Sequence, residues 1–220
     1  MNYSLSQKLG AEALGSLSLA CVVIGSGILA EKLSAGNAGV ALIGNTLATV
    51  AALGVLIYAL GPISGAHFNP AVSLVMTLRR DVSWREFALY VPTQIAAMIV
   101  GAMLSHAMFG LALVQTSQKV RSSLGEGIGE FVATFWLLFT ILFSANRSSL
   151  APVFAVPAAI TAGYWFTSST SFANPAISIA RSLSDTFAGV APSSVPGFVA
   201  AQVLGALAAL LLSKFFLRRA

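Results

Sequence analysis

Charged residues are absent from long parts of this chain, and that feature limits its fold more than any other. The 46 residues from Leu33 to Leu78 and the 33 residues from Ser148 to Ala180 contain no Asp, Glu, Lys or Arg. Since about 20 residues of helix cross the hydrocarbon of a bilayer, each stretch holds one crossing and an apolar remainder. Only 9% of all residues are charged and the mean hydropathy is +0.86, so the sequence predicts an integral membrane protein.

Six membrane-spanning helices fit the uncharged stretches, and we expect 1–220 to form one domain. We place the spans near residues 9–30, 40–60, 85–108, 127–146, 151–168 and 196–216. The basic residues favour both termini on the cytoplasmic side, because the cytoplasmic ends then carry eight of them and the outer ends four. The eight are Lys8, Arg79, Arg80, Arg85, Arg147, Lys214, Arg218 and Arg219, and the four are Lys32, Lys119, Arg121 and Arg181. The basic residues that lie in ones and twos beside the spans account for the sequence pI of about 9.8, so the charge does not call for a nucleic-acid partner.

The tripeptide Asn-Pro-Ala occurs twice, in "HFNPAVSL" from His67 and in "FANPAISI" from Phe172. Each copy follows a run that breaks helices, "GPISGAHF" or "TSSTSFA". Asn is a good N-cap and Pro suits the first helical position, so each copy predicts the start of a short helix. We expect two re-entrant half-helices of roughly 15 Å, ending near Arg79 and Ser184, inside the two apolar remainders. The two motifs are Asn69, Pro70, Ala71 and Asn174, Pro175, Ala176.

The two halves of the chain, approximately 1–115 and 116–220, repeat the same order of features: a span with Glu, a span, a re-entrant motif and a span with Gln. Three spans per half make this an inverted repeat, which places a solute path near the membrane midplane. Glu12 and Glu130 hold equivalent positions, and we expect them to accept hydrogen bonds from the re-entrant backbone. The other interpretation, strongest for Glu12, is a carboxylate that reaches the interface near a helix end.

A path between two such loops favours neutral solutes. The N-termini of the half-helices carry partial positive charge and repel cations, while Asn69 and Asn174 can offer amide donors to a solute. Backbone carbonyls of the loops can supply acceptors, so a solute exchanges hydrogen bonds as it moves. The predicted acceptor row comprises Gly65, Ala66 and His67 in one loop and Thr170, Ser171 and Phe172 in the other.

The chain resembles the aquaporin and aquaglyceroporin (major intrinsic protein) family through "SGAHFNPAVSL", "FANPAISIA", the paired "AE" and "GE" starts and the half-chain symmetry. The resemblance implies a right-handed bundle of six transmembrane helices plus two half-helices, passive conduction of water or small neutral solutes, and a homotetramer in the membrane lipid. It also implies that His67 faces the cytoplasmic vestibule.

The resemblance implies a pore filter that departs from the common pattern. Most members place Arg directly after the second Asn-Pro-Ala, where this chain has Ile177. The corresponding other positions are Thr49, Ala162 and Ser171, and none of them is aromatic, large or charged. The text "NPAISIARSLSDTFAGVAP" is similar to a bacterial subgroup associated with arsenic resistance. A wide channel for arsenite in a bacterial inner membrane is therefore expected, with glycerol and water also open as solutes.

Several alternatives remain at this point. Arg181, four residues after Ile177, could reach the outer vestibule in place of the missing Arg, or could pair with Asp185 at the rim. A water-selective aquaporin and a secondary transporter built on inverted repeats are the other function classes. No set of nucleophile, base and orienting group can be assembled, and no metal-ligand pattern occurs, so we expect no enzyme, cofactor or metal.

Overall fold

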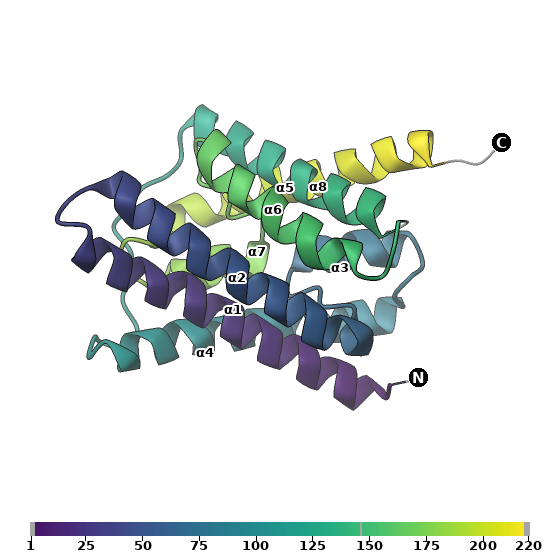
Figure 1. Cartoon of the computed structure of the whole chain (residues 1–220), viewed down its shortest axis with the longest axis horizontal. Helices are drawn as coiled ribbons and strands as arrows, with labels where there is room; N and C mark the ends of the chain where they lie inside the picture. Colours follow the sequence, from purple (N-terminus) through teal and green to yellow (C-terminus); the bar gives the residue numbers. More distant parts are fainter. Residues whose placement is uncertain (1–2, 146, 218–220) are drawn as a thin grey trace.

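Helices form the whole secondary structure of the described residues, 3–145 and 147–217, in this computed structural model (Figure 1). Five helices are long and apolar enough to cross a membrane, and α6 is shorter, with 16 residues. The predicted all-α membrane fold is confirmed. Arg218, Arg219 and the last residue of the fourth predicted span lie outside the described residues. In chain order the elements are α1 (Leu5–Leu33), α2 (Ala38–Ser64), α3 (Pro70–Leu78), α4 (Trp84–Met108), α5 (Leu124–Ser144), α6 (Ala151–Phe166), α7 (Pro175–Arg181), the 3-10 turn η1 (Pro192–Ser194) and α8 (Val195–Phe216).

Local sequence sets where these helices begin and end. Ser83 and Ser123 each cap a helix by accepting the backbone N–H three residues later, and Glu86 and Glu126 return the bond to the cap. These capping boxes begin α4 and α5 at opposite membrane faces. The helix α2 ends at Gly65, whose left-handed backbone (φ 89°) turns the chain into the first re-entrant loop.

The helices pack as two interlocked halves. In the first half α1 contacts α2 and α4, and in the second half α5 contacts α6 and α8. The half-helix α3 of the first half packs against α8, and α7 of the second half packs against α4. These contacts hold the re-entrant segments between the halves and away from lipid. Within the second half, the close approach of α8 to α5 requires glycine, because a Cβ at Gly205 would lie 2.2 Å from the carbonyl oxygen of Phe131.

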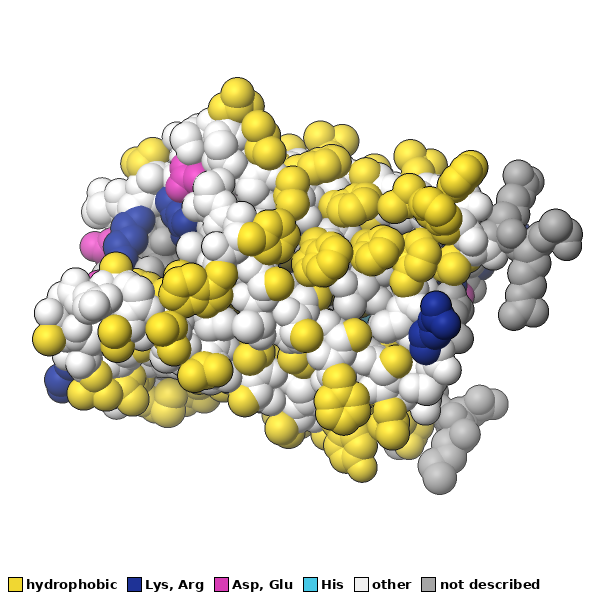
Figure 2. All heavy atoms as spheres, turned by 45° about the horizontal axis from the view of Figure 1, so that its top comes forward, with side chains coloured by type: hydrophobic (Ala, Val, Ile, Leu, Met, Phe, Trp, Pro, Cys, Tyr) yellow, Lys and Arg dark blue, Asp and Glu magenta, His cyan; other side chains and the backbone are white. Residues whose placement is uncertain are grey.

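The outer surface carries many large apolar side chains, and Figure 2 shows hydrophobic atoms between charged ends. Such a surface suits contact with lipid tails. Both termini lie at the same end of the bundle, here called the terminal end, and the α4–α5 connection lies at the other, here called the distal end (Figure 1). Exposed apolar residues along the spans include Leu47, Val55, Leu104, Phe154, Leu204 and Leu211.

Candidate functional site

The two Asn-Pro-Ala motifs meet at the centre of the bundle. The side-chain oxygens of Asn69 and Asn174 accept the backbone N–H groups of Ala71 (2.9 Å) and Ala176 (3.0 Å), so each Asn caps its half-helix. The side-chain nitrogens cross between the halves: Asn69 Nδ2 donates to the carbonyl of Ala173 at 2.7 Å, and Asn174 Nδ2 donates to that of Phe68 at 2.8 Å. Each amide group has two N–H donors, so one on each Asn remains for a solute.

A cavity of about 680 Å³ runs along this meeting point. Its wall includes both Asn69 and Asn174, and it reaches Lys8 near the terminal end and Arg181 on the distal side. The remaining motif residues do not line it; they are buried in the first turns of the half-helices and comprise Pro70, Ala71, Pro175 and Ala176. The half-helix N-termini thus face the cavity and place partial positive charge at its centre.

The re-entrant loops turn their backbone through unusual conformations. Ala66 and Phe68 in one loop, and Thr170, Ser171 and Ala173 in the other, have positive φ values between 46° and 59°. Within the described residues, no hydrogen bond is donated to the six carbonyls of the predicted acceptor row. The cavity wall includes five of these residues, namely Gly65, Ala66, His67, Ser171 and Phe172, whereas Thr170 lies outside it. Unpaired carbonyls beside a polar path can accept bonds from a solute.

Glu12 lies completely buried behind the first loop. Its Oε1 accepts the backbone N–H of His67 at 2.9 Å and the Ser64 hydroxyl at 2.7 Å. Its Oε2 accepts the backbone N–H of Phe68 and the side-chain amide of Gln94, both at 2.8 Å. Four donors on one carboxylate fix the loop in place and leave the group no free acceptor toward the interface.

Glu130 repeats this arrangement behind the second loop. Its Oε1 accepts the backbone N–H of Phe172 at 2.8 Å, and its Oε2 accepts that of Ala173 at 2.9 Å and the amide of Gln202 at 2.6 Å. Gln202 also donates to Ser178 at 2.9 Å, as Gln94 does to Ser73 at 2.9 Å in the first half. The repeat therefore extends to individual hydrogen bonds.

Three of the four filter positions taken from the family resemblance lie on the cavity wall. These are Thr49, Ser171 and Ile177, which are 3%, 4% and 4% exposed. The Thr49 hydroxyl is buried without a hydrogen-bond partner within the described part of the chain.

The assignment of Ala162 to the filter is wrong. Ala162 is exposed on the outer side of α6, while Val156, Ile160 and Tyr164 line the cavity at intervals of four residues. At 100° per residue, a position two residues from Ile160 points to the opposite side of the helix. The cavity wall therefore contains an aromatic residue, Tyr164, that the predicted ring lacked.

Arg181 is buried at the distal side of the cavity, with 5% of its surface exposed. Its Nε donates to the carbonyl of Ala188, and its guanidinium carbon lies 3.4 Å from the ring centroid of Phe172. The alternative ion pair with Asp185 is not formed; Asp185 accepts the backbone N–H of Gln118 at 2.9 Å instead. The cavity wall thus includes a guanidinium one helical turn beyond Ile177.

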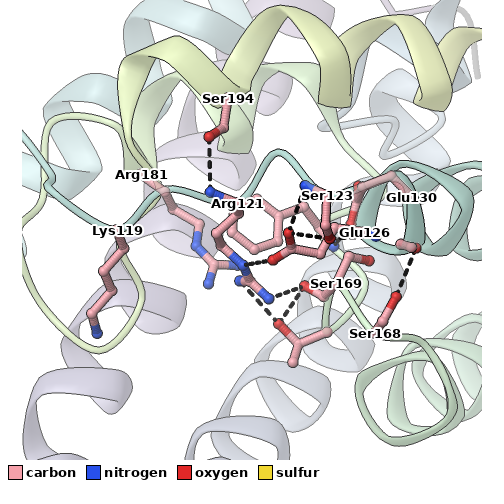
Figure 3. A network of polar contacts seen from close by, with 12 residues as sticks. Lys119, Arg121, Ser123, Glu126, Glu130, Ser168, Ser169, Arg181 and Ser194 are labelled. Atoms are coloured by element: carbon pink, nitrogen blue, oxygen red, sulfur yellow. Dashed lines mark hydrogen bonds and ion pairs between the residues drawn. The ribbon is translucent and has the colours of Figure 1, made fainter.

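Arg121 holds the second loop from outside, a role that no sequence motif predicts (Figure 3). Its Nη2 donates to the carbonyl of Ser169 at 2.9 Å, and its Nε forms an ion pair with Glu126 at 3.2 Å. Its Nη1 lies 3.5 Å from the hydroxyl of Thr170, which itself donates to the Ser169 carbonyl at 2.6 Å. Spacing along the chain could not reveal this contact, because 48 residues separate Arg121 from Ser169.

His67 lies on the cavity wall near the terminal end. Its Nδ1 is 3.0 Å from the Ser73 hydroxyl, and its ring meets that of Tyr90 edge to face with centroids 5.5 Å apart. The other histidine, His106, is completely buried and contacts Ser184 at 2.8 Å, although an interfacial position is usual for a side chain near a span end. No group of three or more His, Cys, Asp and Glu residues that could hold a metal occurs within the described ranges.

Comparisons with known proteins agree with this architecture. Residues 1–163 match the sequence profile of the family described as "Major intrinsic protein". The chain is 48% identical over 218 residues to "Aquaglyceroporin AqpS" of Rhizobium meliloti (strain 1021), covering 99% of this chain and 93% of the relative. It is 27% identical over 236 residues to "Probable aquaporin AqpM" of Archaeoglobus fulgidus, covering 95% and 96%. The fold is similar to that in the X-ray structure of the aquaglyceroporin from Plasmodium falciparum, with TM-score 0.74, 20% identity and coverage of 97% of this chain and 96% of that one. The chain therefore belongs to the major intrinsic protein family of channels for small solutes.

Proposed function

We propose that this protein is a passive channel for small uncharged solutes and that it conducts trivalent metalloid hydroxides such as arsenite, together with glycerol and water. The observation that carries the proposal is the aliphatic side chain of Ile177 on the cavity wall, which Thr49 and Ser171 also line. One apolar wall and one hydrogen-bonding wall suit a solute that has several hydroxyls and no charge.

Passive conduction is supported by the state of the buried acids. Glu12 and Glu130 accept hydrogen bonds from the backbone of the re-entrant loops and from Gln94 and Gln202, so both carboxylates support the loops, and neither lines the cavity. A secondary transporter needs an ion or proton site on its path. The uncharged donors and carbonyls beside the cavity suit a channel better, and cations meet the positive ends of α3 and α7.

A water-selective channel is the second candidate, and Tyr164 and Arg181 favour it. An aromatic ring and a guanidinium on one cavity wall reduce space and favour a small, strongly hydrogen-bonding solute. The two candidates differ in one measurable ratio, the flux of arsenite or glycerol relative to water.

Stopped-flow uptake into proteoliposomes tests the proposal. Wild-type protein should conduct arsenite and glycerol well above empty vesicles, without saturation at millimolar solute and without dependence on Na⁺ or on a proton gradient. Fast water flux with no arsenite or glycerol flux would favour the second candidate. Uptake that requires an ion gradient would contradict both.

We also infer a homotetramer in a bacterial inner membrane with both termini in the cytoplasm. The termini share one end of the bundle, which an even number of crossings requires (Figure 1). The large apolar outer surface suits both lipid and neighbouring copies. Cross-linking in membranes would test the tetramer, and reporter enzymes fused to either end would test the orientation.

A further inference from the structure

Three basic side chains lie at the distal end, where the guanidinium groups of Arg121 and Arg181 come together over Phe172 and the Lys119 ammonium points to one side (Figure 3). Lys119 and Arg121 come from the α4–α5 connection, and Arg181 is the last residue of α7. The connection is fixed to the segment after α7, because the backbone N–H of Ala191 donates to the Lys119 carbonyl at 2.7 Å and that of Arg121 donates to the Ser194 hydroxyl at 2.9 Å. The cluster is therefore part of the folded distal face.

Phe172 joins two of these cations to the cavity. The guanidinium carbons of Arg181 and Arg121 lie 3.4 Å and 5.2 Å from the centroid of its ring. Phe172, Arg181 and Ile177 are all on the cavity wall. Positive charge is thus concentrated where a solute enters from the distal end.

Arg181 has no carboxylate partner within the described residues, although it is almost completely buried. Arg121 shares its charge with Glu126, whereas Arg181 donates only through Nε to the backbone carbonyl of Ala188. Its two terminal NH₂ groups make no hydrogen bond in the part of the chain that the structure describes. The guanidinium lies on the cavity wall, so an anion that entered the cavity there would pair with its charge.

The nearby carboxylates cannot take this role. Asp185 and Glu31 are exposed, and Asp185 already accepts the backbone N–H of Gln118. Water and salt screen exposed charges, so these groups neutralise the buried guanidinium only weakly. Partial burial lowers the pKa of the Lys119 ammonium, which Glu31 opposes and Arg181 reinforces. A nearby anion would therefore stabilise the charged form of Lys119 as well.

We propose that the distal mouth, formed by Arg181, Lys119, Arg121 and Phe172, binds a small oxyanion with one negative charge, such as a carboxylate or dihydrogen phosphate, and that the bound anion slows the entry of neutral solutes. The planar guanidinium fork matches a pair of oxygens, which a halide lacks. The effect on flux rests on the proposed channel function, whereas anion binding does not.

Binding is measured on the purified protein in neutral detergent by isothermal titration calorimetry. The probes are sodium acetate and sodium phosphate near pH 6, with sodium chloride at matched ionic strength. Wild-type protein should bind both oxyanions more tightly than chloride. Arg181→Met should abolish this preference and Lys119→Met should weaken oxyanion binding roughly tenfold. Arg147→Met, an exposed basic residue at the terminal end, is the matched control and should bind as wild type does.

Equal binding by wild type, Arg181→Met and Lys119→Met, or no preference over chloride, would overturn the site. If Arg181→Met does not fold, the exposed Lys119 still decides the question. In phosphatidylcholine vesicles, saturating acetate should lower glycerol flux through wild type and leave flux through Lys119→Met less affected. Binding without any change of flux would overturn the blocking role. Binding by a protein that conducts no solute even without anions would refute the channel function alone.

Discussion

Replacing Glu130 by Gln should release the second re-entrant loop from its main support. The carboxylate accepts the backbone N–H groups of Phe172 and Ala173 and the amide of Gln202. Gln has nearly the same shape but offers one acceptor oxygen and one NH₂ group. In either orientation its NH₂ group faces at least one buried donor that then has no acceptor.

The structure sets the size of this effect. The best orientation turns the new oxygen toward Ala173 and Gln202 and leaves the backbone N–H of Phe172 unpaired. Bonds to a charged acceptor are worth about 1.5–3 kcal/mol and an orphaned buried donor costs about 1–3 kcal/mol. We therefore expect Glu130→Gln to lower the free energy of unfolding by about 2–4 kcal/mol. Solute flux should fall as well, because Ser171, which lines the cavity, lies on the same loop.

The assay combines thermal unfolding in detergent with stopped-flow flux on matched amounts of protein. Glu12→Gln should be at least as destabilising, since each oxygen of Glu12 serves two donors. Glu31→Gln is the control, an exposed carboxylate at the end of α1. If Glu12→Gln and Glu130→Gln both kept the stability and flux of the control, the loops would need no carboxylate and the reasoning would fail.

Three further substitutions test other parts of the molecule. Ile177→Arg should reduce arsenite and glycerol uptake much more than water uptake, while Ile177→Val should preserve all three because it keeps an aliphatic wall; equal loss for every solute would place the filter elsewhere. The double change Asn69→Asp and Asn174→Asp should admit monovalent cations or abolish conduction, because it places negative charge at the half-helix ends, and unaltered neutral flux without cation current in a planar bilayer would contradict this. Gly205→Ala should lower the unfolding free energy by about 1–3 kcal/mol through overlap with Phe131, whereas Gly127→Ala, which meets nothing within 4 Å, should unfold like wild type.

The repeat made the centre of the site predictable from sequence. Asn69 and Asn174 each stand before Pro and Ala, and Glu12 and Glu130 each precede a loop by one span. Residues at equivalent positions of a repeat make equivalent contacts in the two halves. The role of each pair can therefore be inferred from the sequence without knowing any distance. Chain topology then brings Asn69 and Asn174 together and places Glu12 and Glu130 each behind its own loop.

Positions that depend on the rotation of a helix, or on distant segments, could not be predicted. Counting residues back from Asn174 gave Ala162, but the phase of α6 places Tyr164 at the cavity, since the loop between them is extended and its length does not fix the rotation of the helix. Arg121 belongs to a connection without repeat or motif, so only the fold reveals its contact with Ser169. The sequence also did not predict that Arg181 is buried without Asp185 as its partner. Asp185 is bound instead by the backbone N–H of Gln118, which lies 67 residues away along the chain.

The crossed bonds between Asn69 and Ala173 and between Asn174 and Phe68 have a consequence for biogenesis. The partner of the Asn69 side chain is made 104 residues later. At a synthesis rate of about 5–20 residues per second, the first half waits roughly 5 to 20 seconds for it. Glu12 is translated before the loop and Gln94 soon after it, so both can support the loop during that time, but no opposing loop is present to complete a pore. A nascent chain therefore cannot leak solute through this path until its last third has entered the bilayer.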